Sequence, residues 1–116
     1  MIYFDHSATT PIHPKVAEKI DYINREHYAN PSSIYTQGRK AKSLIEKARN
    51  QVADAIGAKV EQIFFTSGGT EANNQVLWTK AEDKKKHIIV SSIEHPAILK
   101  VLKKIKQHGV TASLLP

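Results

Sequence analysis

The sequence predicts an α/β protein, built as a partial three-layer αβα arrangement around a parallel sheet. In the second half of the chain, apolar runs alternate with helical patterns in the order strand, helix, strand, helix, strand. That order is typical of parallel strands joined by crossover helices. A long amphipathic segment, residues 36–56, precedes them. It is expected to cover at least part of the sheet face that the crossover helices leave open, because a parallel sheet needs both faces covered.

The elements of the second half have clear boundaries. Strands are expected at 62–67 (QIFFTS), 87–92 (HIIVSS) and 110–116 (VTASLLP), and helices at 70–82 and 96–108. Gly109 should end the second of these helices. Since crossover connections are right-handed almost without exception, both helices are expected on one face of the sheet.

The first half is expected to be mainly helical. An extended start at 2–4 and a loop rich in turn formers at 5–14 lead to Pro14, which suits the first position of a helix. Apolar or partly apolar residues then recur at three- and four-residue intervals, at Val16, Ile20, Ile23 and His27. In the second helix, 36–56, Ser32 or Ser33 is expected to cap the start and Gly57 to end it.

Size and composition predict an ordinary globular domain. The 116 residues are 41% hydrophobic and 24% charged. No apolar run approaches the ~20 residues of a membrane span, and the N-terminus lacks a basic region followed by an apolar one. A cytoplasmic protein with no membrane contact is therefore expected. The chain has no cysteine, which excludes disulfides and thiol chemistry within it.

The basic excess has two interpretations. A net charge of +6 is compatible with an anionic partner, such as nucleic acid or a phosphorylated ligand. The most basic segments are 84–86 and 100–108. In the second segment the lysines fall opposite Leu102 and Ile105, so a solvated helix face explains them. No zinc-finger, RNP-type or long arginine-rich motif supports a nucleic-acid partner.

The segment TSGGTE, residues 66–71, is a candidate anion site. It follows an expected strand and opens a helix, where ligands bind in open α/β sheets. Gly68 and Gly69 let a ligand approach the backbone, the helix start offers N–H groups, and Thr70 adds a hydroxyl. A tight glycine turn that binds nothing is the alternative. The P-loop and dinucleotide-binding patterns are both absent.

His95 lies in the next loop, SSIEHPA, just before Pro96 opens a helix. A lone loop histidine is usually an exposed polar residue. Both loops, however, should leave the same edge of the sheet, so His95 should face the space beside Gly69 and Thr70. A phosphate cradle beside an imidazole suggests a phosphorylated aromatic cofactor, on which the imidazole can stack and exchange protons near pH 7.

The remaining histidines are less informative. Surface or cap roles suffice for four of them: His13, His27, His87 and His108. His6 is harder to dismiss, because its loop, DHSATT, is unusually rich in hydroxyls. No histidine pair has convincing metal-ligand spacing, so no metal site is predicted.

The sheet is expected to be incomplete. Only three strands are visible, and the last one ends at Pro116 without a following helix. At least one apolar edge would remain unpaired, which invites aggregation unless something covers it. The chain is therefore interpreted as part of a larger protein.

Five motifs in order carry a family resemblance: YFDHSATTPIHPKV, NPSSIYTQGRKAK, ARNQVADAIGA, IFFTSGGTEANN and HIIVSSIEHPAIL. Together they resemble the N-terminal part of the NifS/IscS-like cysteine desulfurases, in the class V aminotransferase group of fold-type-I pyridoxal-phosphate enzymes. The resemblance covers essentially the whole chain. It implies the N-terminal part of the major domain of the PLP-dependent transferase fold, with 1–13 as an extended segment and substrate-side loop and 14–116 in the cofactor-binding domain.

The resemblance also assigns site residues. Gly69 and Thr70 match the family's phosphate-binding pair, and His95 matches the histidine that stacks on the pyridine ring of pyridoxal 5′-phosphate and assists proton transfer. The loop from Asp5 to Thr10 looks like the family's loop beside the substrate pocket. Tyr35 departs from the usual NPSSIH pattern, at a position outside the cofactor contacts.

The implied function is the removal of sulfur from L-cysteine, giving L-alanine and an enzyme persulfide for iron–sulfur cluster or thio-cofactor assembly. A homodimer and a sulfur-acceptor or scaffold protein are the implied partners, with nucleic acid involved at most indirectly, through tRNA thiolation. This chain lacks the cofactor lysine in a Ser-x-His-Lys setting and any cysteine, so it is predicted to be inactive alone. Selenocysteine lyase or another class V enzyme, and a non-catalytic module that binds a phosphorylated ligand or a partner, are the alternatives.

Overall fold

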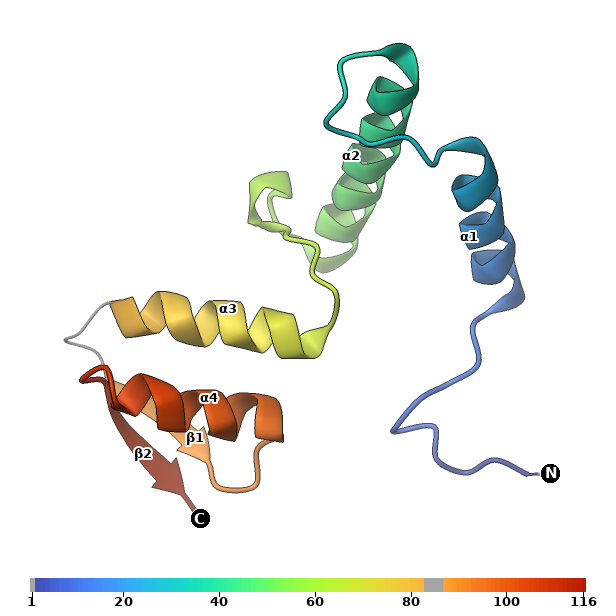
Figure 1. The fold of residues 1–116 in the computed structure, drawn as a ribbon. Helices are drawn as coiled ribbons and strands as arrows, with labels where there is room; N and C mark the ends of the chain where they lie inside the picture. Colours follow the sequence, from blue (N-terminus) through green and yellow to red (C-terminus); the bar gives the residue numbers. More distant parts are fainter. Residues whose placement is uncertain (1, 83–86) are drawn as a thin grey trace. The chain divides into compact units, whose positions relative to one another are not determined.

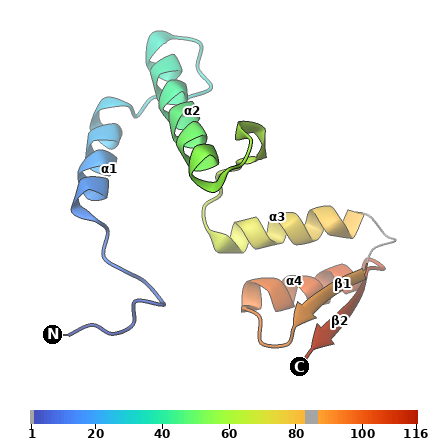
Figure 2. The same ribbon diagram turned by 180° about the vertical axis from the view of Figure 1, so that it is seen from behind.

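The computed structural model describes residues 2–82 and 87–116. The chain divides into two compact units, one ending at Phe64 and the other running from Phe65 to Pro116. Figure 1 shows the elements of both units along the sequence, and Figure 2 shows them from behind. Each unit is considered by itself.

The first unit is helical. It contains α1 (Pro14–Glu26), α2 (Thr36–Ile56) and a 3₁₀ turn, η1 (Val60–Gln62). Both predicted helices are thus confirmed. Pro14 occupies the start of α1, and Gly57 ends α2 in the left-handed conformation with φ 67°, the role that a residue without Cβ fills at a helix C-terminus.

The start of α2 differs from the prediction. The residue before the helix is Tyr35, and it makes no side-chain capping bond. Ser32 and Ser33 instead belong to a turn around Asn30, whose Oδ1 accepts from the Ser32 amide at 2.9 Å and whose carbonyl accepts from the Ser33 amide at 3.1 Å. The asparagine side chain holds this turn together, so the serines lie too early in the chain to cap the helix.

Gly38 explains how this turn packs on α2. A Cβ at Gly38 would lie 2.5 Å from the Ser33 carbonyl oxygen and 2.7 Å from that of Asn30. These are backbone atoms, so the contact cannot be relieved by turning a side chain. The turn therefore reaches the first part of α2 only because position 38 has no side chain.

The strand predicted at 62–67 is not formed. Gln62 ends η1, and residues 63–66 have no regular secondary structure. Ile63 has extended dihedrals, φ −96° and ψ 122°. Its backbone is therefore suited to a strand, but within the described residues no second strand pairs with it. A strand exists only through pairing with a neighbour, so the apolar pattern of 62–67 does not by itself produce a strand.

The second unit contains the α/β arrangement. Its elements are α3 (Gly69–Glu82), β1 (His87–Ser91), α4 (Pro96–Lys106) and β2 (Thr111–Leu115). The two strands are parallel, with His87 opposite Thr111 and Ser91 opposite Leu115. The predicted parallel sheet and both of its helices are confirmed here. The predicted covering of the sheet by 36–56 concerns two different units and stays a prediction.

The core of the second unit lies between the helices and the sheet. Ile105 is fully buried, and Leu102 and Val110 are each 3% exposed. Leu77 of α3 and Ile88 of β1 pack against this cluster. Burying apolar side chains from α3, α4 and both strands stabilises the unit through the hydrophobic effect.

The lysines of α4 lie on its other face. Lys100, Lys103, Lys104 and Lys106 are all exposed, whereas Leu102 and Ile105 are buried. This confirms the predicted amphipathic helix. Gly109 follows with φ 87°, so it turns the chain into β2 as expected. Among the described residues, no helix is long and apolar enough to cross a membrane.

The direction of the elements places two loops together. In Figures 1 and 2, α3 and α4 run side by side in the same direction, opposite to β1. The starts of both helices therefore lie at the end of the unit where β1 finishes. This is the sheet edge at which ligands bind in open α/β folds.

Candidate functional site

The start of α3 presents unpaired backbone donors. Gly68 precedes the helix, and its carbonyl accepts from the Ala72 amide at 3.1 Å. The next N–H groups belong to Gly69 and Thr70, the first two residues of α3. The first N–H groups of a helix have no acceptor inside it, and no other acceptor for these two is found in the described part of the chain. Two donors at the positive end of a helix favour an anion.

The two glycines leave these donors accessible. Neither Gly68 nor Gly69 has a positive φ, so the backbone conformation does not require glycine at either position. A Cβ at either one would meet nothing within 4 Å, so internal packing does not require it either. The missing side chains leave open space beside the backbone at both glycines. That is the arrangement expected where a ligand approaches the backbone closely.

Hydroxyl groups flank the donors. Thr70 is exposed, and its carbonyl accepts from the Asn74 side-chain amide at 2.6 Å. Thr66 Oγ1 donates to the Gly68 carbonyl at 3.3 Å. The Thr70 hydroxyl thus sits beside the two N–H groups in the first turn, while the Thr66 hydroxyl is used within the loop.

Glu71 is a feature that the sequence reasoning missed. Its Oε2 accepts from the Ser67 amide at 2.6 Å and from the Ser67 hydroxyl at 2.7 Å. These hydrogen bonds, the side-chain one first, lower the pKa of the Glu71 carboxyl below its ordinary value. In a capping box the glutamate accepts from the amide three residues before it, which here is Gly68. Glu71 accepts instead from Ser67, one residue earlier, so that spacing does not predict this contact.

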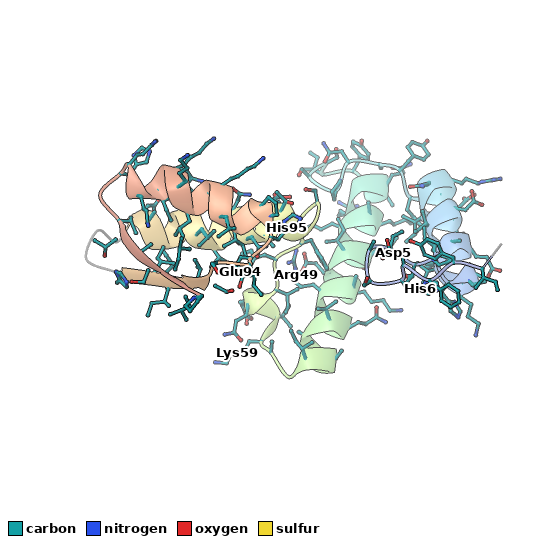
Figure 3. All side chains as sticks on the ribbon, turned by 90° about the horizontal axis from the view of Figure 1, so that it is seen from below. Asp5, His6, Arg49, Lys59, Glu94 and His95 are labelled. Carbon is teal, nitrogen blue, oxygen red and sulfur yellow. The ribbon has the colours of Figure 1, made fainter. Side chains whose placement is uncertain are left out.

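His95 caps α4. Its backbone is extended, with φ −57° and ψ 145°, and Pro96 follows as the first residue of the helix. Nδ1 of the ring accepts from the Ala97 amide at 3.1 Å. In the neutral ring the proton is therefore on Nε2, because Nδ1 provides the lone pair. Figure 3 labels His95 beside Glu94, at the start of α4.

The loop before α4 contributes to one cavity of the second unit. A cavity of about 460 Å³ is lined by residues of α3 and β1 together with Glu94, Ile98 of α4 and Leu115 of β2. Asn73 of α3 lies one turn after Gly69 and Thr70, and Glu94 directly precedes His95. The structure thus brings the two predicted loops to one end of the unit. Gly69, Thr70 and His95 are not among the residues that line this cavity.

The loop from Asp5 to Thr10 belongs to the first unit. The Asp5 carbonyl accepts from the Ala8 amide at 3.1 Å, and Ser7 Oγ donates to Asp5 Oδ1 at 3.2 Å. The rings of Tyr3 and His6 meet edge to face, with centroids 5.0 Å apart. Hydrogen bonds within the turn therefore use some of the polar groups of this loop. Its predicted place beside the substrate pocket stays a prediction.

The other histidines have local partners. His13 caps α1 as His95 caps α4, with Nδ1 accepting from the Lys15 amide at 3.3 Å. His27 ends α1 and lies 3.3 Å from the Tyr22 hydroxyl. Nδ1 and Nε2 of His87 each lie 2.8 Å from a hydroxyl oxygen, of Thr111 and Ser113 respectively. The rings of His108 and Trp78 meet edge to face, with centroids 5.5 Å apart. In residues 2–82 and 87–116, no group of three potential metal ligands is found.

The family follows from comparison with known proteins. The family model described as Aminotransferase class-V matches residues 2–116. The chain therefore belongs to the class V aminotransferase family. The resemblance drawn from the five motifs is confirmed, and so is the expected fold.

Several relatives are cysteine desulfurases by name. The chain is 42% identical to the cysteine desulfurase IscS of Dictyoglomus turgidum and 44% identical to that of Methanosarcina thermophila, in each case over 99% of its own length. It covers 30% and 29% of those two proteins. It is also 42% identical to the selenocysteine lyase of Xenopus tropicalis, over 99% of its length and 30% of that protein. The chain thus spans about a third of the length of these relatives.

Solved structures of related proteins have the same fold over almost the whole chain. A NifS-like protein matches 99% of this chain with a TM-score of 0.92 and 38% identity, and the chain covers 32% of it. A structure described as SspA in complex with cysteine matches 97% of the chain with a TM-score of 0.89 and 34% identity, and 33% of that protein is covered.

Proposed function

We propose that this sequence carries the phosphate-binding half of the cofactor site of a pyridoxal-phosphate-dependent cysteine desulfurase. One observation carries the proposal. α3 and α4 begin at the same end of the unit, one with two unpaired N–H groups and the other with an imidazole. A phosphate and an aromatic ring on one small molecule match these two features.

The residues present fit the phosphate group. The N–H groups of Gly69 and Thr70 and the Thr70 hydroxyl are three donors in one helix turn, with open space in front of the glycines. The helix start adds a partial positive charge. The alternative of a purely structural glycine turn is less well supported, because neither backbone dihedrals nor packing requires the glycines.

His95 is proposed to contact the pyridine ring of the cofactor. The Ala97 amide holds Nδ1, which fixes the ring direction and leaves Nε2 free to give or take a proton. An imidazole suits this role because its ring nitrogen can act as a general acid or base. Pyridoxal phosphate, when bound, supplies an electron sink for the substrate carbanion.

The proposed reaction removes sulfur from L-cysteine and leaves alanine and a persulfide on an enzyme cysteine. This sequence contains neither a cysteine nor a lysine in a Ser-x-His-Lys setting, so those groups must come from elsewhere in the protein. A cytoplasmic homodimer that hands sulfur to an acceptor or scaffold protein belongs to the same proposal. The relatives named cysteine desulfurase, at about 42% identity, support it.

A selenocysteine lyase is the second candidate. The relative of that name is as similar as the desulfurases, at 42% identity, and the described residues include no feature that separates sulfur from selenium. A direct comparison of alanine release from L-cysteine and L-selenocysteine, in the protein containing this sequence, distinguishes the two.

Binding of a phosphorylated pyridine tests the proposal. Pyridoxamine 5′-phosphate is the appropriate probe, because it has no aldehyde and cannot react with the exposed lysines. Equilibrium dialysis of the 116-residue chain should show it binding more tightly than pyridoxamine, which lacks the phosphate. Equal binding of the two, or none, would contradict the proposed phosphate site.

A second assay tests the missing groups. The chain incubated with L-cysteine and pyridoxal phosphate should release no more alanine than free pyridoxal phosphate does. Turnover above that level would show that the chain itself supplies the groups assigned to the rest of the protein.

A further inference from the structure

The carboxylate of Glu71 binds the residue that lies two positions before the start of its own helix. One oxygen, Oε2, takes both the amide and the hydroxyl of Ser67, at 2.6 and 2.7 Å. Charge-assisted bonds of this kind are stronger than those between neutral groups. The side chain therefore ties together the two ends of a five-residue segment, from Ser67 to Glu71 in the first turn of α3.

This contact separates the polar groups of the loop into two sets. The Ser67 amide and hydroxyl are used by Glu71, whereas the amides of Gly69 and Thr70 are not used within the described residues. A glutamate in the first turn of a helix often stabilises the helix start by its charge alone. Here it also fixes the position of the residue just before the glycines.

The amides of Gly69 and Thr70 and the Thr70 hydroxyl are called the phosphate cup. We propose that Glu71 is a positioning residue for this cup: by holding Ser67, it keeps the Gly69 and Thr70 amides ordered and open for the phosphate of the ligand. The inference rests on the proposed function and adds a residue to it. It also indicates which hydroxyl contacts the ligand. Ser67 Oγ donates to Glu71, so Thr70 Oγ1 is the hydroxyl left for the phosphate.

An opposing effect makes the proposal testable. An ionised carboxylate near a phosphate repels it, and the lowered pKa of Glu71 keeps the carboxyl ionised at neutral pH. If repulsion outweighed positioning, every substitution that removes the charge would improve ligand binding. If positioning dominates, Glu71→Gln should be mild, because its side-chain oxygen still accepts from Ser67, and Glu71→Ala should be harmful.

The ligand measurement uses pyridoxamine 5′-phosphate and the 116-residue chain. Glu71→Ala is expected to weaken binding by roughly three- to tenfold, the effect of about one lost hydrogen bond, and Glu71→Gln by less. Glu82→Ala is the matched control, because it removes the same charge from the other end of α3; it should leave binding unchanged.

A measurement without ligand tests the positioning role of Glu71 separately from the proposed phosphate site. Amide hydrogen exchange at Ser67 should be faster in Glu71→Ala than in the unsubstituted chain and in Glu82→Ala, whether or not a ligand binds. Unchanged exchange, or Glu71→Ala binding the probe as well as or better than the unsubstituted chain, overturns the role of Glu71. Failure of the unsubstituted chain to bind the probe contradicts the proposed function instead.

Discussion

The ring of His95 is anchored to its own helix: Nδ1 accepts a hydrogen bond from the Ala97 amide at 3.1 Å. The same side chain is proposed to serve the cofactor ring through Nε2. His95 thus has an observed structural role at the start of α4 and a proposed chemical role through Nε2.

Substitutions at His95 should separate these roles. The side-chain oxygen of asparagine can replace Nδ1 as the cap, so His95→Asn should retain the stability of the unit, whereas His95→Ala should cost about 1 kcal/mol. Urea unfolding measures both. Both variants should weaken binding of pyridoxamine 5′-phosphate, because both lack the ring. Undiminished binding in His95→Asn would contradict the proposed ring contact.

His13 supplies an internal control for that experiment. It caps α1 through the same Nδ1 contact and also precedes a proline, but it has no assigned cofactor role. His13→Asn should therefore change neither ligand binding nor stability appreciably.

The tautomer of His95 is a second prediction. At pH 8.5, where an ordinary imidazole is neutral, the ring should carry its proton on Nε2, because Nδ1 accepts from Ala97. The two ring nitrogens give distinct ¹⁵N NMR shifts in the two tautomers. A proton on Nδ1 would show that the cap seen here does not persist in solution.

Glycine substitutions give a third prediction. Gly69→Ala should leave the stability of the chain unchanged or slightly raised, since a Cβ there meets nothing within 4 Å and the position is helical. It should nevertheless weaken binding of the phosphorylated probe. Gly38→Ala is the contrasting variant, because its Cβ would lie 2.5 Å from the Ser33 carbonyl oxygen, and it should be destabilising. Loss of folding in Gly69→Ala would mean that the glycine serves the fold.

Stability should depend on the ionisation of Glu71. The pKa of its carboxyl is lowered in the folded chain, so the unfolded chain takes up a proton more readily. The stabilisation is present above the ordinary carboxyl pKa and is lost as pH falls through the lowered folded value. The stability difference between the unsubstituted chain and Glu71→Gln should therefore shrink as pH is lowered from 7 to 3. The same series with Glu82→Gln should lack this trend.

Core packing gives a last prediction on the fold of the second unit. Ile105 of α4 is completely buried in the core of the second unit. Ile105→Ala should therefore lower the unfolding free energy by about 2–5 kcal/mol. Ile93 is 89% exposed, and Ile93→Ala should have almost no effect. Similar small effects for both would show that this core is not the one that stabilises the chain.

Local signals in the sequence predicted most of the elements correctly. Pro14 and Gly57 mark helix ends because their backbone preferences act on single residues. The burial of Leu102 and Ile105 follows from helical periodicity, and the parallel pairing of β1 and β2 follows from the order of elements. In each case the information lies within one segment or in the order of neighbouring segments.

The errors came from contacts between segments. Residues 62–67 have an apolar, strand-like pattern, but a strand needs a partner, and its own sequence does not specify one. Ser33 looked like a cap because its contact with Asn30 was not evident. The hydrogen bonds that Ser67 donates to Glu71 were not predicted, because the usual helix-start pattern pairs a glutamate with the amide three residues before it, not four.

The most direct test of the central claim is an amide NMR titration of the ¹⁵N-labelled chain with pyridoxamine 5′-phosphate. The proposed site predicts that the largest shifts occur at the amides of Gly69 and Thr70, with a further change at the ring of His95, and that pyridoxamine without phosphate leaves the two amides unmoved. Shifts spread over the lysines of α4 would indicate general attraction to a chain of net charge +6. That result, or no shift at Gly69 and Thr70, would contradict the assignment of this loop as the phosphate cup.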